Sequence, residues 1–431
     1  KGNTFDIKLS KKFDFNQKRS KPKPSKIITP SNSNDPKLRF YQNILQNLQQ
    51  DMIFVQSAEL HDENLYIGVV NNKYNNPIDL LSHTNEVINE LSVVQDVAIN
   101  NVSLTTINSG METGTITAKT KNRLIPGKLG YIKLQEPANK TDEYDFQTIL
   151  QFPEFYSSIK PEFIYRYADP TRFFAGGIDL MLTSEVKFSP SFYLNSNISY
   201  QLKNSYTRLR YFPDSPYLPH VRTDVVKYLN QRPDLYLNTM QLDKVMKLNN
   251  GHYLKLTAGM FEMMFGGYGA EYYWKPFNKD YSFGLNLYKA RQRDFNQQFG
   301  FAKYEVLTGH ANVQYFHQKS NILIDLSIGQ YLAGDQGFTL DFARKFNSGT
   351  KMGAYFTRTN ISKEEYGEGS FDRGFYFEVP LNYFFNGDGR GSRKLIIQPL
   401  TRDGGAKLKT NAPLIYSIFG GSISDHSFYE E

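Results

Sequence analysis

Seven arginines are the residues of this sequence best suited to chemistry, because a guanidinium group can hold an anionic polymer through paired hydrogen bonds. They lie on segments with strand-like alternation, and two pairs are spaced so that both members share one strand face. Facing the inside of a barrel, they would give such a polymer a positive wall. These candidate polymer contacts in the lumen are Arg208, Arg210, Arg291, Arg293, Arg344, Arg358 and Arg373.

The alternative is that the same arginines pair with acids and brace the barrel, since charges inside membrane barrels usually pair. Both interpretations stay open at the level of sequence. The candidate bracing acids are Asp294, Asp335, Asp341, Glu368 and Asp372.

Few residues suggest catalysis or a bound cofactor. Ser215 with His220 and Asp224, and His310 beside Thr308, are the constellations that merit naming, and no nucleophile elbow frames Ser215. The acids of GEGSFDR do not follow the spacing of a calcium loop, and the absence of Cys excludes thiolate metal sites. Basic residues are scattered, with no nucleic-acid recognition module. We expect no enzymatic activity, metal, cofactor or nucleic-acid partner.

The composition favours strands with one aromatic and one polar face. The chain has 431 residues, 40% of them hydrophobic, with 30 Tyr, 33 Phe and one Trp, and a formal charge of +7. Tyrosine suits the wall of a polymer conduit, because its flat ring can stack on a ligand while its hydroxyl forms hydrogen bonds. No apolar run reaches the length of a membrane-spanning helix, so a membrane span would require a closed barrel. The chain begins at Lys1 without a signal peptide, which indicates a mature form or a fragment.

Residues 161–420 carry the pattern of an antiparallel transmembrane β-barrel. Alternating segments such as FYLNSNISY and ILIDLSI recur about every ten to fifteen residues and number about twelve to fourteen. Turn signals such as Asn347-Ser348-Gly349 separate them, and Val221, Val225, Tyr228 and Leu229 predict one helical insertion. A soluble β-sandwich also alternates, but the long series of hairpins favours a barrel.

The rest of the chain divides into shorter units. Residues 1–16 alternate as one strand, 17–35 form a Pro-rich linker, and 36–123 predict a small α/β domain with helices on one face of its sheet. His61 and His83 in that domain are expected at its surface. Residues 124–160 are expected as a connection and 421–431 as a tail.

Seven ordered stretches resemble the YjbH/GfcD family of outer-membrane proteins encoded with exopolysaccharide and group 4 capsule machinery. They are LRYFPDSPYLPHVRTDVVKYL, FGGYGAEYYWKPF, ARQRDF, TGHA, GQYLAGDQGFTLDFARKFNSGTKMGAYFTRTN, GEGSFDRGFYFEVPL and QPLTRDGGAKL. The resemblance implies a C-terminal outer-membrane barrel preceded by a small periplasmic domain. It also implies a second barrel, of which residues 1–16 would be the closing strand. The tail GGSISDHSFYEE departs from the family pattern.

The resemblance further implies a role in exopolysaccharide or capsule secretion. We expect the barrel to guide or gate the polymer, with polysaccharide, outer-membrane lipids and other secretion proteins as partners. Two alternatives stay open: a scaffold that holds the secretion machinery through the periplasmic domain, and a general porin for small solutes.

Overall fold

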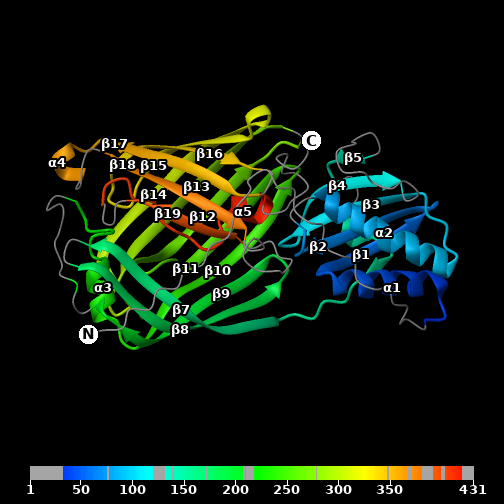
Figure 1. The fold of residues 1–431 in the computed structure, drawn as a ribbon, viewed down its shortest axis with the longest axis horizontal. Coiled ribbons are helices and arrows are strands. Elements are labelled where there is room, and N and C mark those ends of the chain that lie inside the picture. Colours follow the sequence, from blue (N-terminus) through cyan, green and yellow to red (C-terminus); the bar gives the residue numbers. More distant parts are fainter. Residues whose placement is uncertain are drawn as a thin grey trace, which may run out of the picture.

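The chain folds into a small α/β unit followed by a large curved antiparallel sheet (Figure 1). The computed structural model describes residues 33–74, 77–119, 132–137, 140–169, 172–206, 209, 218–277, 279–346, 349–366, 371–380, 392–398 and 403–419. The strand predicted at residues 1–16, most of the linker and the tail 421–431 lie outside these ranges. No helix among the described residues is both long enough and apolar enough to cross a membrane.

The α/β unit has a six-stranded sheet in the order β5-β4-β3-β2-β1-β6, with two long helices. Only β2 and β3 pair in parallel, and α2 connects them. Asp35 begins α1 by accepting hydrogen bonds from the backbone N–H groups of Lys37 and Leu38, and Pro36 and Pro77 occupy first-turn positions. Its elements are α1 (Pro36–Gln50), β1 (Ile53–His61), β2 (Asn64–Asn71), α2 (Pro77–Gln95), β3 (Asn101–Asn108), β4 (Met111–Lys119), β5 (Ile132–Gln135) and β6 (Phe146–Gln147).

The order of elements in the α/β unit matches the prediction, but its extent does not. Strands β5 and β6 come from the segment expected as a connection, because they complete the two edges of the sheet. His83 is buried at 6% exposure against Asp51, so its predicted surface position is wrong.

The large sheet contains thirteen strands, each paired antiparallel with its sequence neighbour. This number falls within the predicted range, although the first strand begins before residue 161. The strands are β7 (Glu154–Asp169), β8 (Arg172–Ser189), β9 (Phe192–Asn204), β10 (Leu235–Asn249), β11 (His252–Met260), β12 (Phe265–Trp274), β13 (Tyr281–Arg293), β14 (Phe301–His317), β15 (Ile322–Gln330), β16 (Gln336–Lys345), β17 (Lys351–Thr359), β18 (Asp372–Pro380) and β19 (Ser392–Ile397).

The edges of this sheet are β7 and β19, which run in the same direction because the strand number is odd. No pairing between them occurs among the described residues, so closure of the barrel stays a prediction. The predicted helical insertion is confirmed as α3 (Val225–Gln231), between β9 and β10. Two further helices are α4 (Lys363–Tyr366) and α5 (Leu414–Phe419).

The two ends of the sheet differ. At one end the α/β unit contacts the tight turns: Asn250, between β10 and β11, donates a hydrogen bond to Glu136 at 3.2 Å. The opposite end carries the longest connection, the stretch with α3 between Asn204 and Leu235. We call these the domain end and the far end.

Candidate functional site

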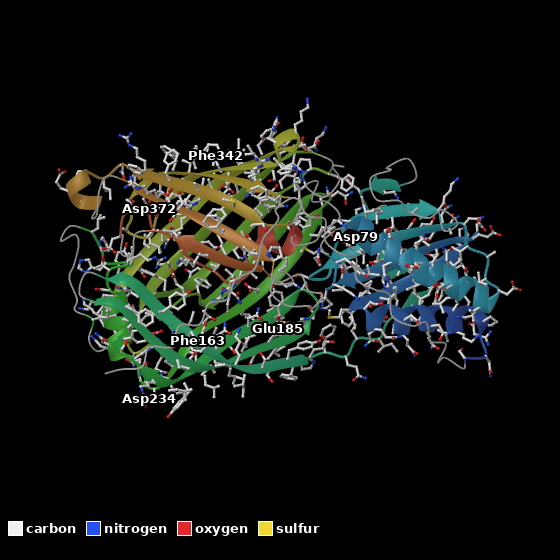
Figure 2. All side chains as sticks on the ribbon, viewed as in Figure 1. Asp79, Phe163, Glu185, Asp234, Phe342 and Asp372 are labelled. Carbon is white, nitrogen blue, oxygen red and sulfur yellow. The ribbon has the colours of Figure 1, made fainter. Side chains whose placement is uncertain are left out.

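The two faces of the large sheet have opposite polarity. The outer face exposes large apolar side chains; Phe342, for example, is 44% exposed and lies on the outer surface in Figure 2. In water each such exposed side chain would forgo about 1.5–3 kcal/mol of burial free energy. This set includes Phe155, Ile159, Phe163, Leu180, Leu242, Leu256, Leu285, Leu287, Val313, Ile328, Phe342 and Phe375.

The inner face is polar, and its side chains are buried even though they are hydrophilic. They include Asp179, Ser199, Gln241, Asp243, Lys255, Thr257, Glu271, Ser282, Thr308, Ser327, Thr339 and Thr357. A soluble sandwich would bury its apolar face against a second sheet, whereas this sheet turns that face outward. The alternation therefore supports the arrangement of a membrane barrel, in which apolar side chains face outward and polar side chains face inward.

The chain itself fills the polar interior. After β19 reaches the far end, residues 403–419 return along the inside of the sheet to the domain end, where α5 lies within its curve (Figure 1). We call residues 403–419 the interior segment. The barrel predicted over residues 161–420 includes this segment, which forms none of the strands of the sheet.

At the far end, the interior segment is held by carboxylates. Asp403 is 2% exposed and accepts hydrogen bonds from the backbone N–H groups of Arg222 and Thr223, at 2.8 and 3.0 Å, and from the Thr223 hydroxyl at 2.8 Å. Asp335 accepts from the Gly405 N–H at 2.8 Å. The Arg222 guanidinium donates to the carbonyl oxygen of Lys407 at 2.7 Å.

Midway along the interior, the wall binds the backbone of the segment. The Gln241 amide donates to the carbonyl oxygen of Asn411 at 2.8 Å and accepts from the Asn411 N–H at 2.9 Å. Lys255 donates to the carbonyl oxygens of Asn411 and Ala412, at 3.0 and 2.7 Å. Glu271 accepts from the Leu414 N–H at 2.7 Å. These wall groups therefore contact the interior segment through its backbone rather than through specific side chains.

Lys255 is also the centre of a buried charge cluster. Its ammonium group lies 3.3 Å from an Asp243 oxygen and 3.6 Å from a Glu271 oxygen, and Lys255 and Asp243 have no exposed side-chain area. The Tyr288 hydroxyl donates to Glu271 at 2.8 Å. Buried charges need such partners, because an unpaired charge away from water is strongly destabilising.

At the domain end, the interior segment becomes apolar. Leu414 and Ile418 pack with Tyr193, Val245, Tyr253 and Tyr273 of the wall, and this cluster includes Met111 of the α/β unit. The segment thus ends in a hydrophobic contact where the sheet meets the α/β unit.

The predicted arginine pair Arg291 and Arg293 does not share a face. A register shift between them turns Arg293 inward, where it is fully buried, while Arg291 remains 47% exposed on the outer face. The Arg293 guanidinium donates to the carbonyl oxygens of Leu237, Asn238, Glu262 and Gln298, at 2.7–3.3 Å. Arg293 therefore braces the far end through backbone carbonyls, not through acids.

Three further candidate arginines lie on the outer face. Arg344 pairs with Ile322, Arg358 with Phe338, and Arg373 with Phe356, so each shares the outward-facing side of the sheet with an apolar residue. All three are exposed. Their predicted placement in the lumen is wrong, as it is for Arg291. Arg208, Arg210 and the candidate acid Glu368 lie outside the described residues, so their roles stay predictions.

The candidate acids have other roles than the predicted one. Asp335 holds the interior segment, Asp341 accepts from the Tyr376 hydroxyl at 2.9 Å, and Asp372 accepts from the Arg373 N–H at 2.9 Å. The backbone N–H of Asp294 donates to Gly300 within its own loop. Buried pairs such as Arg232–Asp179, at 3.2 Å, brace the wall instead, so the interior charges do pair, but between residues that the sequence analysis did not choose.

The catalytic alternatives gain no supporting geometry. His310 packs edge-on against Tyr331, with ring centroids 4.7 Å apart, while the Thr308 hydroxyl donates to a backbone carbonyl. His220 lies 3.5 Å from Asp224, and Ser215 is outside the described residues. No group of three potential metal ligands occurs in the described ranges.

These features define a class: proteins built on a large curved antiparallel sheet with an apolar outer face and a polar inner face. The sequence pattern of one family, YjbH, described as exopolysaccharide biosynthesis protein, matches residues 1–418. The chain belongs to the YjbH family.

One curated relative is an uncharacterized lipoprotein YjbH of Escherichia coli K12, 40% identical over 239 residues. The match covers 54% of this chain and 33% of the relative, so it spans about a third of that protein's length. Among solved structures, OpdK of Pseudomonas aeruginosa is 11% identical with a TM-score of 0.30, covering 67% of this chain and 82% of its own. An OmpT loop-deletion mutant of Vibrio cholerae is 10% identical with a TM-score of 0.25, covering 52% and 85%. At these TM-scores the likeness adds nothing to the fold described above.

Proposed function

We propose that this chain is an outer-membrane component of exopolysaccharide export, in which the interior of the sheet guides the polymer and the interior segment gates it. The α/β unit would lie in the periplasm and contact other secretion proteins. Membership of the YjbH family supports the link to exopolysaccharide, and the apolar outer face supports a membrane position.

The observation that carries the gating proposal is how the wall holds residues 403–414. The wall contacts are spaced along the interior and are directed at backbone groups. A conduit needs contacts that are individually weak, so that a chain can bind and still move on. Sugar hydroxyls can use the same donors and acceptors once the segment has left. The segment thus occupies the path that a polymer would take.

Locking the interior segment to the wall tests this function. Glu262 accepts from the backbone N–H of Lys409 at 3.5 Å, so the pair Glu262→Cys and Lys409→Cys places one thiol on each partner. This sequence has no Cys, so within it a short bis-thiosulfonate reagent reacts only at the two introduced thiols, forming a disulfide with each and releasing a sulfinate each time. We expect crosslinked cells to secrete less exopolysaccharide with unchanged protein in the outer membrane, and a reductant to restore secretion.

Each single-Cys variant, treated with the same reagent, is the control and should secrete normally. Normal secretion by fully crosslinked protein would refute gating. If export in that case still requires the protein, the scaffold alternative accounts for its role.

A further inference from the structure

Five cationic side chains lie on the outer face near the far end. We call Lys289, Arg291, Lys303, Arg358 and Arg373 the basic band. They come from β13, β14, β17 and β18, and each lies on the outward-facing side of its strand. Asp372, next to Arg373, lies at the end opposite the α/β unit in Figure 2.

One half of the basic band lies on β13 and β14. Lys289 approaches Glu305 at 3.1 Å and Arg291 approaches the same carboxylate at 3.9 Å. These side chains are 43–50% exposed, and Lys303 is also exposed. One acid therefore faces three cations, which leaves this cluster with a net positive charge.

The other half lies on β17 and β18. Arg373 is opposite Phe356, and Arg358 is two residues beyond Phe356 on the same face, so the two guanidinium groups are diagonal neighbours. Arg373 stacks over the Phe371 ring at 5.2 Å. Neither side chain forms an ion pair with any residue in the described ranges. Within the described part of the chain, two exposed guanidinium groups are thus available to an anion.

Amide side chains occupy the strands between these clusters. Gln336 donates to Gln330 at 3.3 Å, and Asn360 accepts from the Gln336 N–H at 2.9 Å. Amides bind sugar hydroxyls readily, because each offers both donors and an acceptor. Cations flanking a row of amides suit a phosphorylated sugar better than a simple phosphate ester.

The depth of the band fits a lipid headgroup. Phe338 lies opposite Arg358 at the level of the band, and Phe356 and Phe375 lie on the same face as Arg358 and Arg373, two residues closer to the centre of the sheet. Cationic side chains at the border of an apolar belt reach the headgroup layer while their stems stay against hydrocarbon.

We propose that the basic band binds the phosphate groups of a glycolipid in the membrane leaflet at the far end. This inference rests on the membrane position in the proposed function. It assigns Arg291, Arg358 and Arg373 to lipid on the outside of the sheet. The same charge on the outer face would also fix the vertical position of the sheet in the membrane.

The test compares two pairs of arginines on the same face. Arg358→Gln with Arg373→Gln removes two of the five cations of the band, and Arg344→Gln with Arg393→Gln removes two exposed arginines at the domain end. The full chain is purified in detergent and titrated with bisphosphorylated lipopolysaccharide. Loss of two charge-assisted contacts should weaken binding about tenfold in the far-end variant, with little change in the domain-end variant. Dephosphorylated lipopolysaccharide should bind both variants and the native chain equally weakly, and inorganic phosphate should not compete.

Equal binding by the two variants would overturn the inference. The inference would also fail if the native chain bound the dephosphorylated lipid as tightly as the bisphosphorylated one. Insertion of the same protein into phosphatidylcholine vesicles is measured in parallel. It separates a failure of the basic-band inference from a failure of the proposed membrane position. A protein that inserts but does not distinguish the lipids refutes only the basic band. A protein that enters no vesicle refutes the membrane position itself.

Discussion

The ammonium group of Lys255, on the wall strand β11, donates a hydrogen bond to the carbonyl oxygen of Asn411 at 3.0 Å, although the two residues are 156 positions apart. This contact ties the interior segment to the wall at its middle. We predict that deleting residues 403–431 makes the sheet permeable to small sugars in a liposome-swelling assay, whereas the full chain stays closed. Deleting only 420–431 is the matched control, because it keeps the segment and every contact described here. Swelling by the full chain would show an open porin instead.

The charge cluster around Lys255 should contribute strongly to the stability of the folded sheet. Lys255→Met leaves the buried carboxylates of Asp243 and Glu271 without their cation, and such a loss typically costs about 3–5 kcal/mol. Lys289→Met changes the same residue type at an exposed pair, which is worth about 0–1 kcal/mol. The temperature at which each folded form loses its anomalous gel mobility reports the difference. Equal temperatures would contradict the burial argument.

Sequence reasoning predicted the strands well, because alternation follows directly from the two polarities of a membrane sheet. It also contained the signal that places the arginines. Arg358 has the parity of Phe356, and Arg373 has the parity of Phe375, so each belongs to the apolar face. The positive charge suggested a lumen, but the period of two in a strand fixes the face.

Two features could not be predicted from local pattern. The bulge that separates Arg291 from Arg293 depends on the partner strand and on the carbonyls that Arg293 meets across the far end. The interior segment is recognised only through contacts with distant wall residues. Its sequence does give a hint, since DGGAKLKTNAP lacks the alternation of the strands before it.

The bulge has a testable consequence. Arg293→Lys keeps the charge but loses the planar fork that serves four carbonyls, and hydrogen bonds to charged groups contribute about 1.5–3 kcal/mol each. We expect markedly less folded protein in the outer membrane, measured by its heat-modifiable band. Arg291→Lys, two residues away and half exposed, should leave that amount unchanged. A normal yield of the Arg293 variant would show that the guanidinium geometry is dispensable.

Acid should weaken the α/β unit through His83. Its ring lies 2.9 Å from Asp51, and Lys73 approaches the other Asp51 oxygen at 2.6 Å. Burial lowers the pKa of His83 below its usual 6.5, and Lys73 acts in the same direction, against the opposing effect of Asp51. Between the two pKa values the unfolded chain binds a proton that the folded one does not. The contribution of His83 to the free energy of unfolding is therefore fully present above the pKa of the unfolded state. It falls as the pH drops through 6.5, by at most about 1.4 kcal/mol per pH unit.

The helical circular-dichroism signal follows this unit, because α1 and α2 are the longest helices in the described structure. The midpoint of urea unfolding measured with this signal should decrease when the pH of the native chain is lowered from 7.5 to 5.5. The His83→Gln variant should show a weaker dependence on pH. His61→Gln is the control, since His61 is 72% exposed in its side chain and lies beside Asp62 at the surface. An unchanged slope in the His83 variant would mean that another group takes up the proton on unfolding.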